Sequence, residues 1–195
     1  MIKDLVLKNR SYRAYDESCA MTREDLLELV DVARLCASTT NKQALKFYIV
    51  WERGLVDAIV PLTRWAGMLP ERGLPDPGKH PSAFIIVCVD KEIQPDPANK
   101  WIGYDTGIAV QSMLLAAAEK GLGGLMIGNV KFAELSALLQ LPERYQPILA
   151  VAFGKPDEEV RLVGLPEDGS TKYYRDEKDV HYVPKRTLEE LVINY

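Results

Sequence analysis

The longest apolar pattern in the chain runs over residues 101–129 and predicts a buried helix followed by a short strand. Nothing breaks a helix over residues 104–120, and both bulky aliphatic side chains and alanines surround it. A helix that is apolar on nearly every side is buried on nearly every side, and its alanines allow another backbone to come close, as in a dimer core. Gly121 is placed to end this helix in a left-handed C-cap. Residues 125–127 predict the strand, and the bare amide of Gly128 suits a planar ligand lying flat on the backbone.

Shorter patterns on both sides predict the other elements. Thr22 is a good N-cap for a helix whose apolar stripe continues to Ala37. Residues 83–90 form a continuous apolar run, which predicts a strand in the centre of a sheet. Further helices are predicted at residues 2–9, 55–69 (where Pro61 can interrupt) and 132–139, further strands at 47–52 and 148–153, and loops at 38–41, 70–81 and 91–100.

The chain changes character after residue 156. Residues 157–195 are charged and aromatic and offer little core of their own, so they are either disordered or laid on another surface. Tyr173, Tyr174 and Tyr182 favour the second alternative, and residues 188–192 have the pattern of a small anchoring helix. A second subunit is the obvious surface. We therefore expect a core at residues 1–156 and an extension at residues 157–195 that embraces a partner subunit.

Composition narrows the classes of function. The chain has 195 residues, of which 47% are hydrophobic and 27% charged, which is ordinary globular composition. A net charge of −4 argues against a nucleic-acid partner. The apolar run at 101–129 is too short and too interrupted for a bilayer, which needs about 20 apolar residues, so no membrane partner is expected.

Cysteine and histidine usage argues against a metal site and against a disulfide framework. Cys19, Cys36 and Cys88 lie far apart with no C-x-x-C motif, and His80 and His181 are isolated. The N-terminus has no apolar segment typical of a signal peptide. A cytoplasmic location is the expectation.

Two basic clusters match a phosphate group. Arg10, Ser11 and Arg13 stand close together near the N-terminus, and arginine donates hydrogen bonds in a fork that fits oxyanions. Lys185 and Arg186 form a second basic pair near the other end. Two solvated charge clusters are the alternative, and on these residues alone that alternative is the better one.

The polar loop after the second predicted helix carries groups that can bind a heterocycle. Ser38, Thr39, Asn41 and Gln43 supply hydroxyl and amide groups that both donate and accept hydrogen bonds. A capped turn is the alternative explanation of the same residues.

Other features carry less chemistry. The glycines at residues 121–124 follow a helix and precede a strand, which is the reverse of the order in a dinucleotide-binding loop, so we reject that function. Asp105 fits a cap or a buried partner better than a general base. Trp65 and Tyr104 can flank a flat ligand in a substrate pocket, although aromatic side chains are more often core.

In order along the chain, five blocks resemble the FMN-dependent nitroreductase family. They are RSYRAYD, STTNKQALKF, DTGIAVQSMLLAAAEKGLGGLMIG, AVAFGKP and KRTLEELV. The likeness spans almost the whole chain, within a short branch of that family. Two departures concern the pocket: Ala44-Leu45 stands where the family often has Pro-Trp, and Ala37 stands where it often has proline.

This resemblance implies a fold, a cofactor and a set of binding residues. The fold would be α+β, an antiparallel-dominated central sheet wrapped by helices, with the long central helix at a homodimer interface and the C-terminal tail reaching the partner. One FMN would bind in each subunit, and Ile127 and Gly128 would lie near its N5 and O4 atoms. The phosphate and its neighbourhood would be held by Arg10, Ser11, Arg13, Lys185 and Arg186, and the partner subunit would contribute Ser38, Thr39, Asn41 and Gln43.

The resemblance also implies an activity. NADH or NADPH would reduce the flavin and leave, and an electron-poor acceptor such as a nitroaromatic or a quinone would then take the electrons in a ping-pong mechanism. No side chain is expected to act as a catalytic acid or base. A flavin-binding sensor or storage protein, or a flavin-dependent dehalogenase or oxidative enzyme, remains an alternative.

Overall fold

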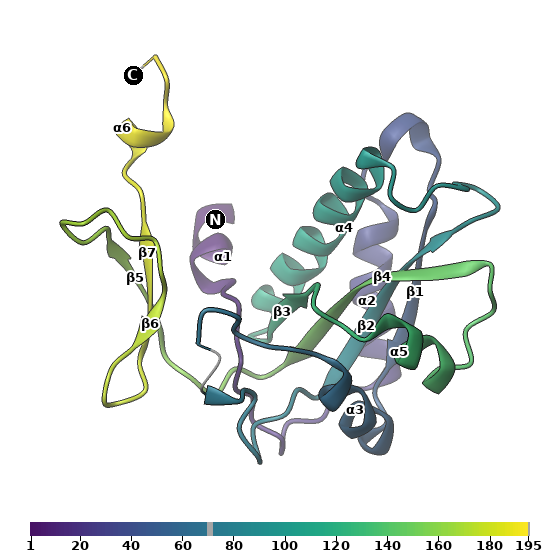
Figure 1. Ribbon diagram of the computed structural model, residues 1–195, viewed down its shortest axis with the longest axis horizontal. Helices are drawn as coiled ribbons and strands as arrows, with labels where there is room; N and C mark the ends of the chain where they lie inside the picture. The colour runs from purple at the N-terminus through teal and green to yellow at the C-terminus, as the bar shows by residue number, and fades with distance from the viewer. Residues whose placement is uncertain (70–71, 195) are drawn as a thin grey trace.

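The core of the molecule is a four-stranded sheet with the strand order β1-β2-β4-β3. The computed structural model describes residues 1–69 and 72–194 (Figure 1). The strands are β1 (Leu45–Val50), β2 (Ala83–Asp90), β3 (Gly123–Ile127) and β4 (Tyr145–Gly154). All neighbouring strands pair antiparallel, so the predicted α+β fold with an antiparallel-dominated sheet is confirmed. β1 begins at Leu45 rather than at residue 47 and ends at Val50 rather than at residue 52.

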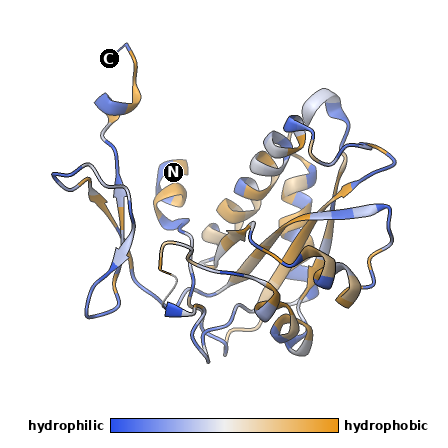
Figure 2. Ribbon diagram, viewed as in Figure 1, coloured by the Kyte–Doolittle hydropathy of each residue, from blue (hydrophilic) through white to orange (hydrophobic). Residues whose placement is uncertain are grey.

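Helices cover both faces of this sheet. α2 (Arg23–Arg34) and α4 (Lys100–Glu119) pack on the face that carries Ile85 and Val87. α3 (Arg53–Ile59) and α5 (Phe132–Leu138) pack on the face that carries Phe84 and Ile86. All positions of β2 are buried, because side chains alternate between two covered faces, which explains why its sequence is continuously apolar. The sheet is the most hydrophobic part of the ribbon in Figure 2.

Polar side chains cap the starts of the two long helices, α2 and α4, and a glycine ends α4. Thr22 and Asp25 form a capping box at the start of α2, as its sequence predicts. α4 starts at Lys100, before the predicted residue 104, because the Asn99 side chain accepts a hydrogen bond from the backbone of the new helix. Gly121 ends α4 at φ +74°, with a 2.9 Å hydrogen bond from the next residue back to the Ala117 carbonyl. The predicted left-handed C-cap is confirmed.

One face of α4 lies open in the single chain. Val110 and Met113 are fully buried against the sheet and α2, whereas Tyr104 is 58% exposed and Ile108 is 44% exposed. The expectation that the helix is buried on nearly every side is therefore not met within one chain. A strip of apolar surface remains along α4, beginning with Trp101.

The helix predicted at residues 55–69 is wrong in its second half. α3 ends at residue 59, and one 3-10 turn, η2 (Val60–Leu62), follows it. Pro61 has no N–H to continue an α-helix, and its ring collides with the preceding turn, so the chain departs there. Thr63 instead bridges Val130, next to the end of β3.

The predicted loops are found with small differences. Residues 38–41 contain a 3-10 turn, η1 (Thr39–Asn41), and residues 91–99 connect β2 to α4. Residues 73–81 are a loop, whereas residues 70 and 71 lie outside the described residues.

The C-terminal segment, residues 157–194, forms a small sheet of its own. β5 (Val160–Gly164) pairs parallel with β7 (His181–Lys185), and β6 (Tyr174–Arg175) pairs antiparallel with β7. The predicted helix near the C-terminus is present as α6 (Leu188–Leu191). At the other end of the chain, α1 (Ile2–Lys8) is the first helix. The segment is ordered by backbone pairing on both edges of β7, which the sequence did not predict, and it contributes no buried residue to the described hydrophobic clusters. That it reaches a partner subunit stays a prediction. Figure 1 shows this segment, in yellow-green to yellow, standing beside the core.

Candidate functional site

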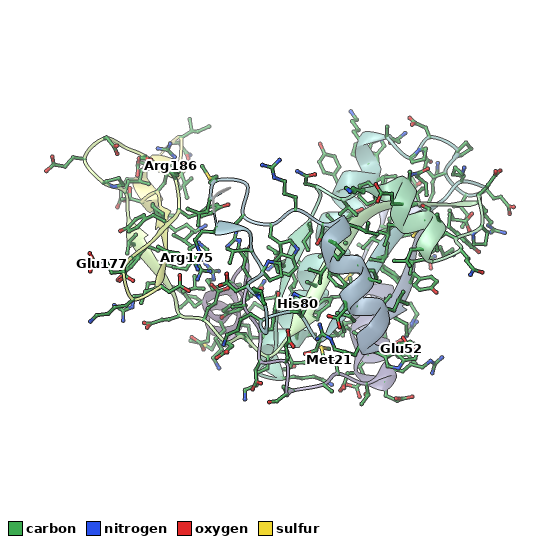
Figure 3. The ribbon with its side chains drawn as sticks, turned by 60° about the horizontal axis from the view of Figure 1, so that its bottom comes forward. Met21, Glu52, His80, Arg175, Glu177 and Arg186 are labelled. Carbon is green, nitrogen blue, oxygen red and sulfur yellow. The ribbon has the colours of Figure 1, made fainter. Side chains whose placement is uncertain are left out.

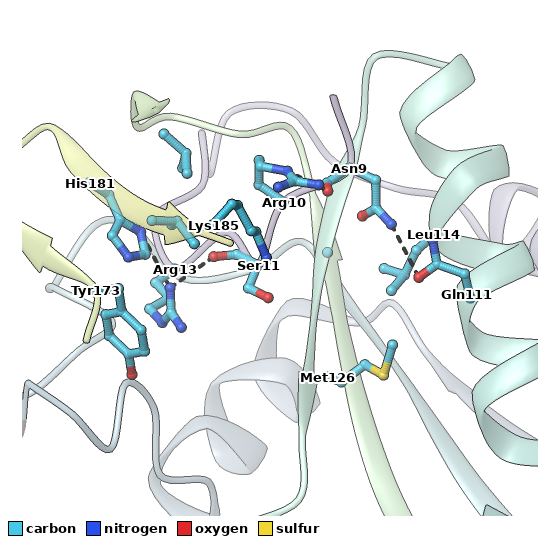
Figure 4. A pocket seen from close by; sticks show the side chains of 13 residues that line it. Asn9, Arg10, Ser11, Arg13, Gln111, Leu114, Met126, Tyr173, His181 and Lys185 are labelled. Carbon is cyan, nitrogen blue, oxygen red and sulfur yellow. Dashed lines mark hydrogen bonds between the residues drawn. The ribbon is translucent and has the colours of Figure 1, made fainter. Parts of the chain in front are cut away.

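A cleft of about 380 Å³ lies between the core and the C-terminal segment (Figure 4). The N-terminal segment after α1, α4, β3 and β7 all contribute to it. Four of the predicted phosphate ligands meet there, namely Arg10, Ser11, Arg13 and Lys185. We call this the cationic cleft, and its full lining is Asn9, Arg10, Ser11, Arg13, Gln111, Leu114, Gly124, Met126, Val160, Tyr173, His181, Val183 and Lys185.

Glycines in β3 allow the N-terminal segment to reach the cleft. Ser11 bridges Gly124 in parallel, and the Tyr12 amide donates to the Gly124 carbonyl at 3.2 Å. A Cβ on Gly124 would stand 2.6 Å from a Leu114 side-chain carbon, and one on Gly123 would stand 2.3 Å from the Tyr12 ring. These glycines therefore serve close packing, in keeping with the rejection of a dinucleotide-binding loop.

Arg13 is the most enclosed cation of the cleft. Arg13 as a whole residue is only 7% exposed. Its NH1 donates to the Ser11 carbonyl at 3.0 Å and lies 3.3 Å from His181 Nδ1, and its guanidinium stacks over the Tyr173 ring at 4.8 Å. Burial lowers the pKa of the Arg13 guanidinium, although the group keeps its charge. An anion bound beside it would stabilise this buried charge.

The other cations of the cleft are more accessible. Arg10 donates to the carbonyls of Asn9 and Val6, both at 2.6 Å, so it also caps the end of α1, and partial burial lowers its pKa. Among the described residues Lys185 forms no ion pair. Arg186 points elsewhere, since its NH1 lies 3.1 Å from Glu190 and it does not line the cleft. Figure 3 labels Arg186 on the C-terminal segment.

The donor set of the cleft fits a phosphate group. Two guanidiniums, an ammonium and a hydroxyl converge on it, and the Arg13 Nε–H is buried with no partner among the described residues. An oxyanion would supply acceptors for such donors. Across the residues that the structure describes, no cluster of three metal-ligating side chains occurs.

The polar loop lies apart from this cleft in the single chain. Ser38 and Gln43 line a second cleft of about 290 Å³ between α2, β1 and α4, and Thr39 lines a third of about 300 Å³. Asp105 Oδ1 accepts hydrogen bonds from the Thr39 amide and hydroxyl, each at 2.8 Å, so Asp105 is a buried partner as expected. Asn41 belongs to the same turn and lines none of these three clefts.

The backbone of the polar loop is held in an uncommon conformation. Thr40, Asn41 and Gln43 have φ of 50°, 55° and 52°, in the left-handed region that side chains other than glycine rarely adopt. Each such residue costs of order 1–3 kcal/mol, and such strain gathers at ligand sites.

The remaining predicted site residues are distributed around these clefts. Ile127 is 3% exposed, and the exposed Gly128 follows it, beyond the Met126 of the cationic cleft. Trp65 is 4% exposed, donates to Thr63 Oγ1 at 2.7 Å, packs in the core and does not line the cationic cleft. Tyr104 lies on the open face of α4, edge-on to Trp101.

Several cleft residues carry no signal in the sequence. Tyr173, His181 and Gln111 line the cationic cleft, yet His181 meets Arg13 across a separation of 168 residues. No spacing rule connects such distant positions. The cluster of aromatic residues in the C-terminal segment was the available hint, and it pointed to burial rather than to a site.

The fold is α+β, and a cleft lined by three cationic side chains lies beside its antiparallel sheet. The sequence profile of the nitroreductase family matches residues 6–155, and the chain belongs to that family. It is 27% identical over 159 residues to an Archaeoglobus fulgidus protein named for NADH dehydrogenase and NAD(P)H nitroreductase activity, which covers 80% of this chain and 85% of the relative.

Solved structures agree on the fold. A nitroreductase family protein from Streptococcus pneumoniae superimposes with a TM-score of 0.68 at 17% identity, covering 86% of this chain and 97% of that one. A nitroreductase from Exiguobacterium sibiricum, solved in complex with FMN, gives a TM-score of 0.67 at 19% identity, covering 86% and 94%. In the described part of this chain, no helix combines the length and the apolar character needed to cross a membrane.

Proposed function

We propose that the protein is an FMN-dependent oxidoreductase that passes electrons from NADH or NADPH to an electron-poor small molecule such as a nitroaromatic or a quinone. The observation that carries the proposal is the convergence of Arg10, Ser11, Arg13 and Lys185 on one cleft beside β3. The FMN held by the Exiguobacterium relative and the activities for which the Archaeoglobus relative is named support it.

Different residues of the cleft would bind different parts of FMN. Arg13 and Lys185 would bind the FMN phosphate through charge-assisted hydrogen bonds, and Arg10 and Ser11 would complete its shell. The exposed backbone at Gly128 would face the isoalloxazine ring, where an amide donor stabilises negative charge. FMN, when bound, would supply the hydride and electron transfer, and solvent would supply the protons that the reduced acceptor takes up, so no side chain is assigned as a catalytic acid or base. Arg186 would have to leave Glu190 before it could join the phosphate site.

We propose further that the active unit is a homodimer with two shared sites. The apolar strip on α4 and the exposed Leu188 and Leu191 of α6, at 62% and 65%, are surfaces that a second copy would cover. The polar loop lies beside Asp105 in the first half of α4, whereas the cationic cleft of the same chain is lined by Gln111 and Leu114 further along the helix, so Ser38 and Thr39 would serve the flavin of the other subunit. An obligate interface of this kind buries more than about 2,000 Å².

Analysis of the purified protein tests these proposals together. We expect one FMN per subunit after denaturation, and sedimentation of the FMN-loaded protein as a dimer. Recovery of FAD, or of no flavin even after incubation with FMN, would contradict the cofactor. A flavin-loaded monomer at micromolar concentration would contradict the shared site.

A further inference from the structure

A buried carboxylate lies directly behind the cationic cleft. The Glu158 side chain is 3% exposed and stands in the C-terminal segment, just before β5. Its Oε1 accepts hydrogen bonds from the backbone amides of Arg13 and of Ala14, the latter at 3.2 Å. Its Oε2 accepts from the guanidinium of Arg175, whose side chain is 5% exposed. One carboxylate thus joins the N-terminal segment of the core to the C-terminal sheet.

The surrounding side chains fix the Arg13 guanidinium rather than its backbone. Tyr173 stacks beneath it, and His181 Nδ1 faces its NH1. Because an arginine N–H can only donate, Nδ1 is the acceptor and the ring proton lies on Nε2. Tyr173 is held in turn by a hydrogen bond at 3.2 Å between its hydroxyl and the Met68 amide.

The carboxylates of this cluster are shared unequally between its two arginines. Arg13 and Arg175 are both buried cations, and Glu158 is the anion that contacts the group, while His181 lies 3.9 Å from Glu158. Arg175 also pairs with the half-exposed Asp179 at 3.0 Å. Among the described residues no carboxylate pairs with the Arg13 guanidinium, and Arg13 is the member of the cluster that lines the cleft. A guanidinium without a paired carboxylate therefore faces the position proposed for the phosphate.

We propose that Glu158 is a positioning residue for the phosphate-binding Arg13, and that through it the cleft discriminates FMN from flavins that lack a phosphate. Glu158 holds the backbone of residues 13 and 14 without neutralising the Arg13 side chain, so it sets where that guanidinium stands. The inference rests on the proposed function, because it assumes that Arg13 binds the FMN phosphate.

The neighbouring glutamate provides a matched control. Glu159 is 55% exposed and pairs only on the surface with Arg161. Glu158→Gln keeps the shape of the side chain but places an amide donor where Arg175 needs an acceptor, whereas Glu159→Gln changes the same charge one residue away. Glu158→Asp keeps the buried charge and shortens its reach, so it serves as a second variant with less effect on folding.

The test compares FMN with riboflavin, which lacks the phosphate, by quenching of flavin fluorescence in the full-length protein. For Glu158→Gln we expect the FMN Kd to rise at least about tenfold, while the riboflavin Kd stays within about twofold, because a hydrogen bond to a charged group is lost at the phosphate alone. Glu158→Asp should show the same selective loss at smaller size, and Glu159→Gln should match the wild-type protein. Thermal unfolding of each variant verifies that it is folded.

Two results would overturn the inference. Equal losses of FMN and riboflavin affinity would show that Glu158 supports the fold only. Wild-type FMN affinity in folded Glu158→Asp or Glu158→Gln would show that it does not position Arg13. If the wild-type protein itself bound FMN no more tightly than riboflavin, the proposed phosphate site would fail, and that outcome is distinct from either of these.

Discussion

Protonation of His181 is expected to destabilise the folded protein as the pH falls. Burial, and then the neighbouring charges of Arg13 and Arg175, lower the pKa of His181 from 6.5 to about 4. The residue is 1% exposed and its Nε2 has no partner among the described residues, so burial disfavours the charged ring more than the nearby carboxylates of Glu158 and Asp179 favour it. His181 therefore stays neutral in the folded state at a pH where the unfolded chain already binds a proton.

The sign and the size follow from linkage. Above pH 6.5 both states are neutral at this position, and the stability is fully present. Between pH 6.5 and about 4 the unfolded state binds more protons, so the free energy of unfolding decreases as the pH falls. The difference between 6.5 and about 4 corresponds to about 3 kcal/mol, at about 1.4 kcal/mol for each pKa unit.

Urea unfolding of His181→Asn measures this contribution. The asparagine oxygen can still accept a hydrogen bond from Arg13 but does not titrate, so the variant should lack the loss of about 2–3 kcal/mol that the wild-type protein shows between about pH 7 and about pH 4.5. His80→Asn removes the other histidine of the chain and should retain the wild-type loss. A parallel decline in the wild-type protein and in His181→Asn would refute the assignment of a neutral, buried His181.

Two further substitutions test the cleft and its construction. Lys185→Ala should weaken FMN binding by about 1.5–3 kcal/mol, because it removes a cation that lines the cleft. Arg186→Ala should weaken FMN binding less, because Arg186 pairs with Glu190. Equal effects of the two substitutions in a fluorescence titration would contradict this prediction. Gly124→Ala should lower the free energy of unfolding by about 1–3 kcal/mol, because its Cβ would stand 2.6 Å from Leu114 and from a backbone oxygen. An unchanged denaturation midpoint would contradict this prediction, because it would show that β3 and α4 can move apart around the added methyl group without loss of stability.

The elements of the core could be predicted because each one carries a complete local signal. The sequence predicted three features that the structure contains: the Thr22 cap of α2, the continuously apolar strand β2 and the glycine that ends α4. The helix predicted at 55–69 failed because apolar spacing continued past Pro61, although the proline ends the regular hydrogen bonding there. The small C-terminal sheet was missed because the pairing of β5 with β7 is parallel and non-local, and its strands are short.

The candidate site was predictable in its cations and not in their supports. Residue type made Arg10, Arg13 and Lys185 candidates, the family resemblance favoured them over solvated charge clusters, and the structure brings them to one cleft. Glu158 was not found, because its contact with Arg13 spans 145 residues and depends on how the C-terminal segment folds back. Whether the polar loop at Ser38 completes a site depends on a second copy of the chain, which stays a prediction.

The most direct test of the central claim follows the colour of the bound flavin without oxygen. The FMN-loaded protein is mixed anaerobically with NADH or NADPH, and then with a nitroaromatic or a quinone. We expect the nicotinamide to bleach the visible absorbance of the flavin and the acceptor to restore it, in two separate steps. A flavin that dithionite reduces, but that neither NADH nor NADPH reduces, would contradict the account and favour a flavin-binding protein without reductase turnover.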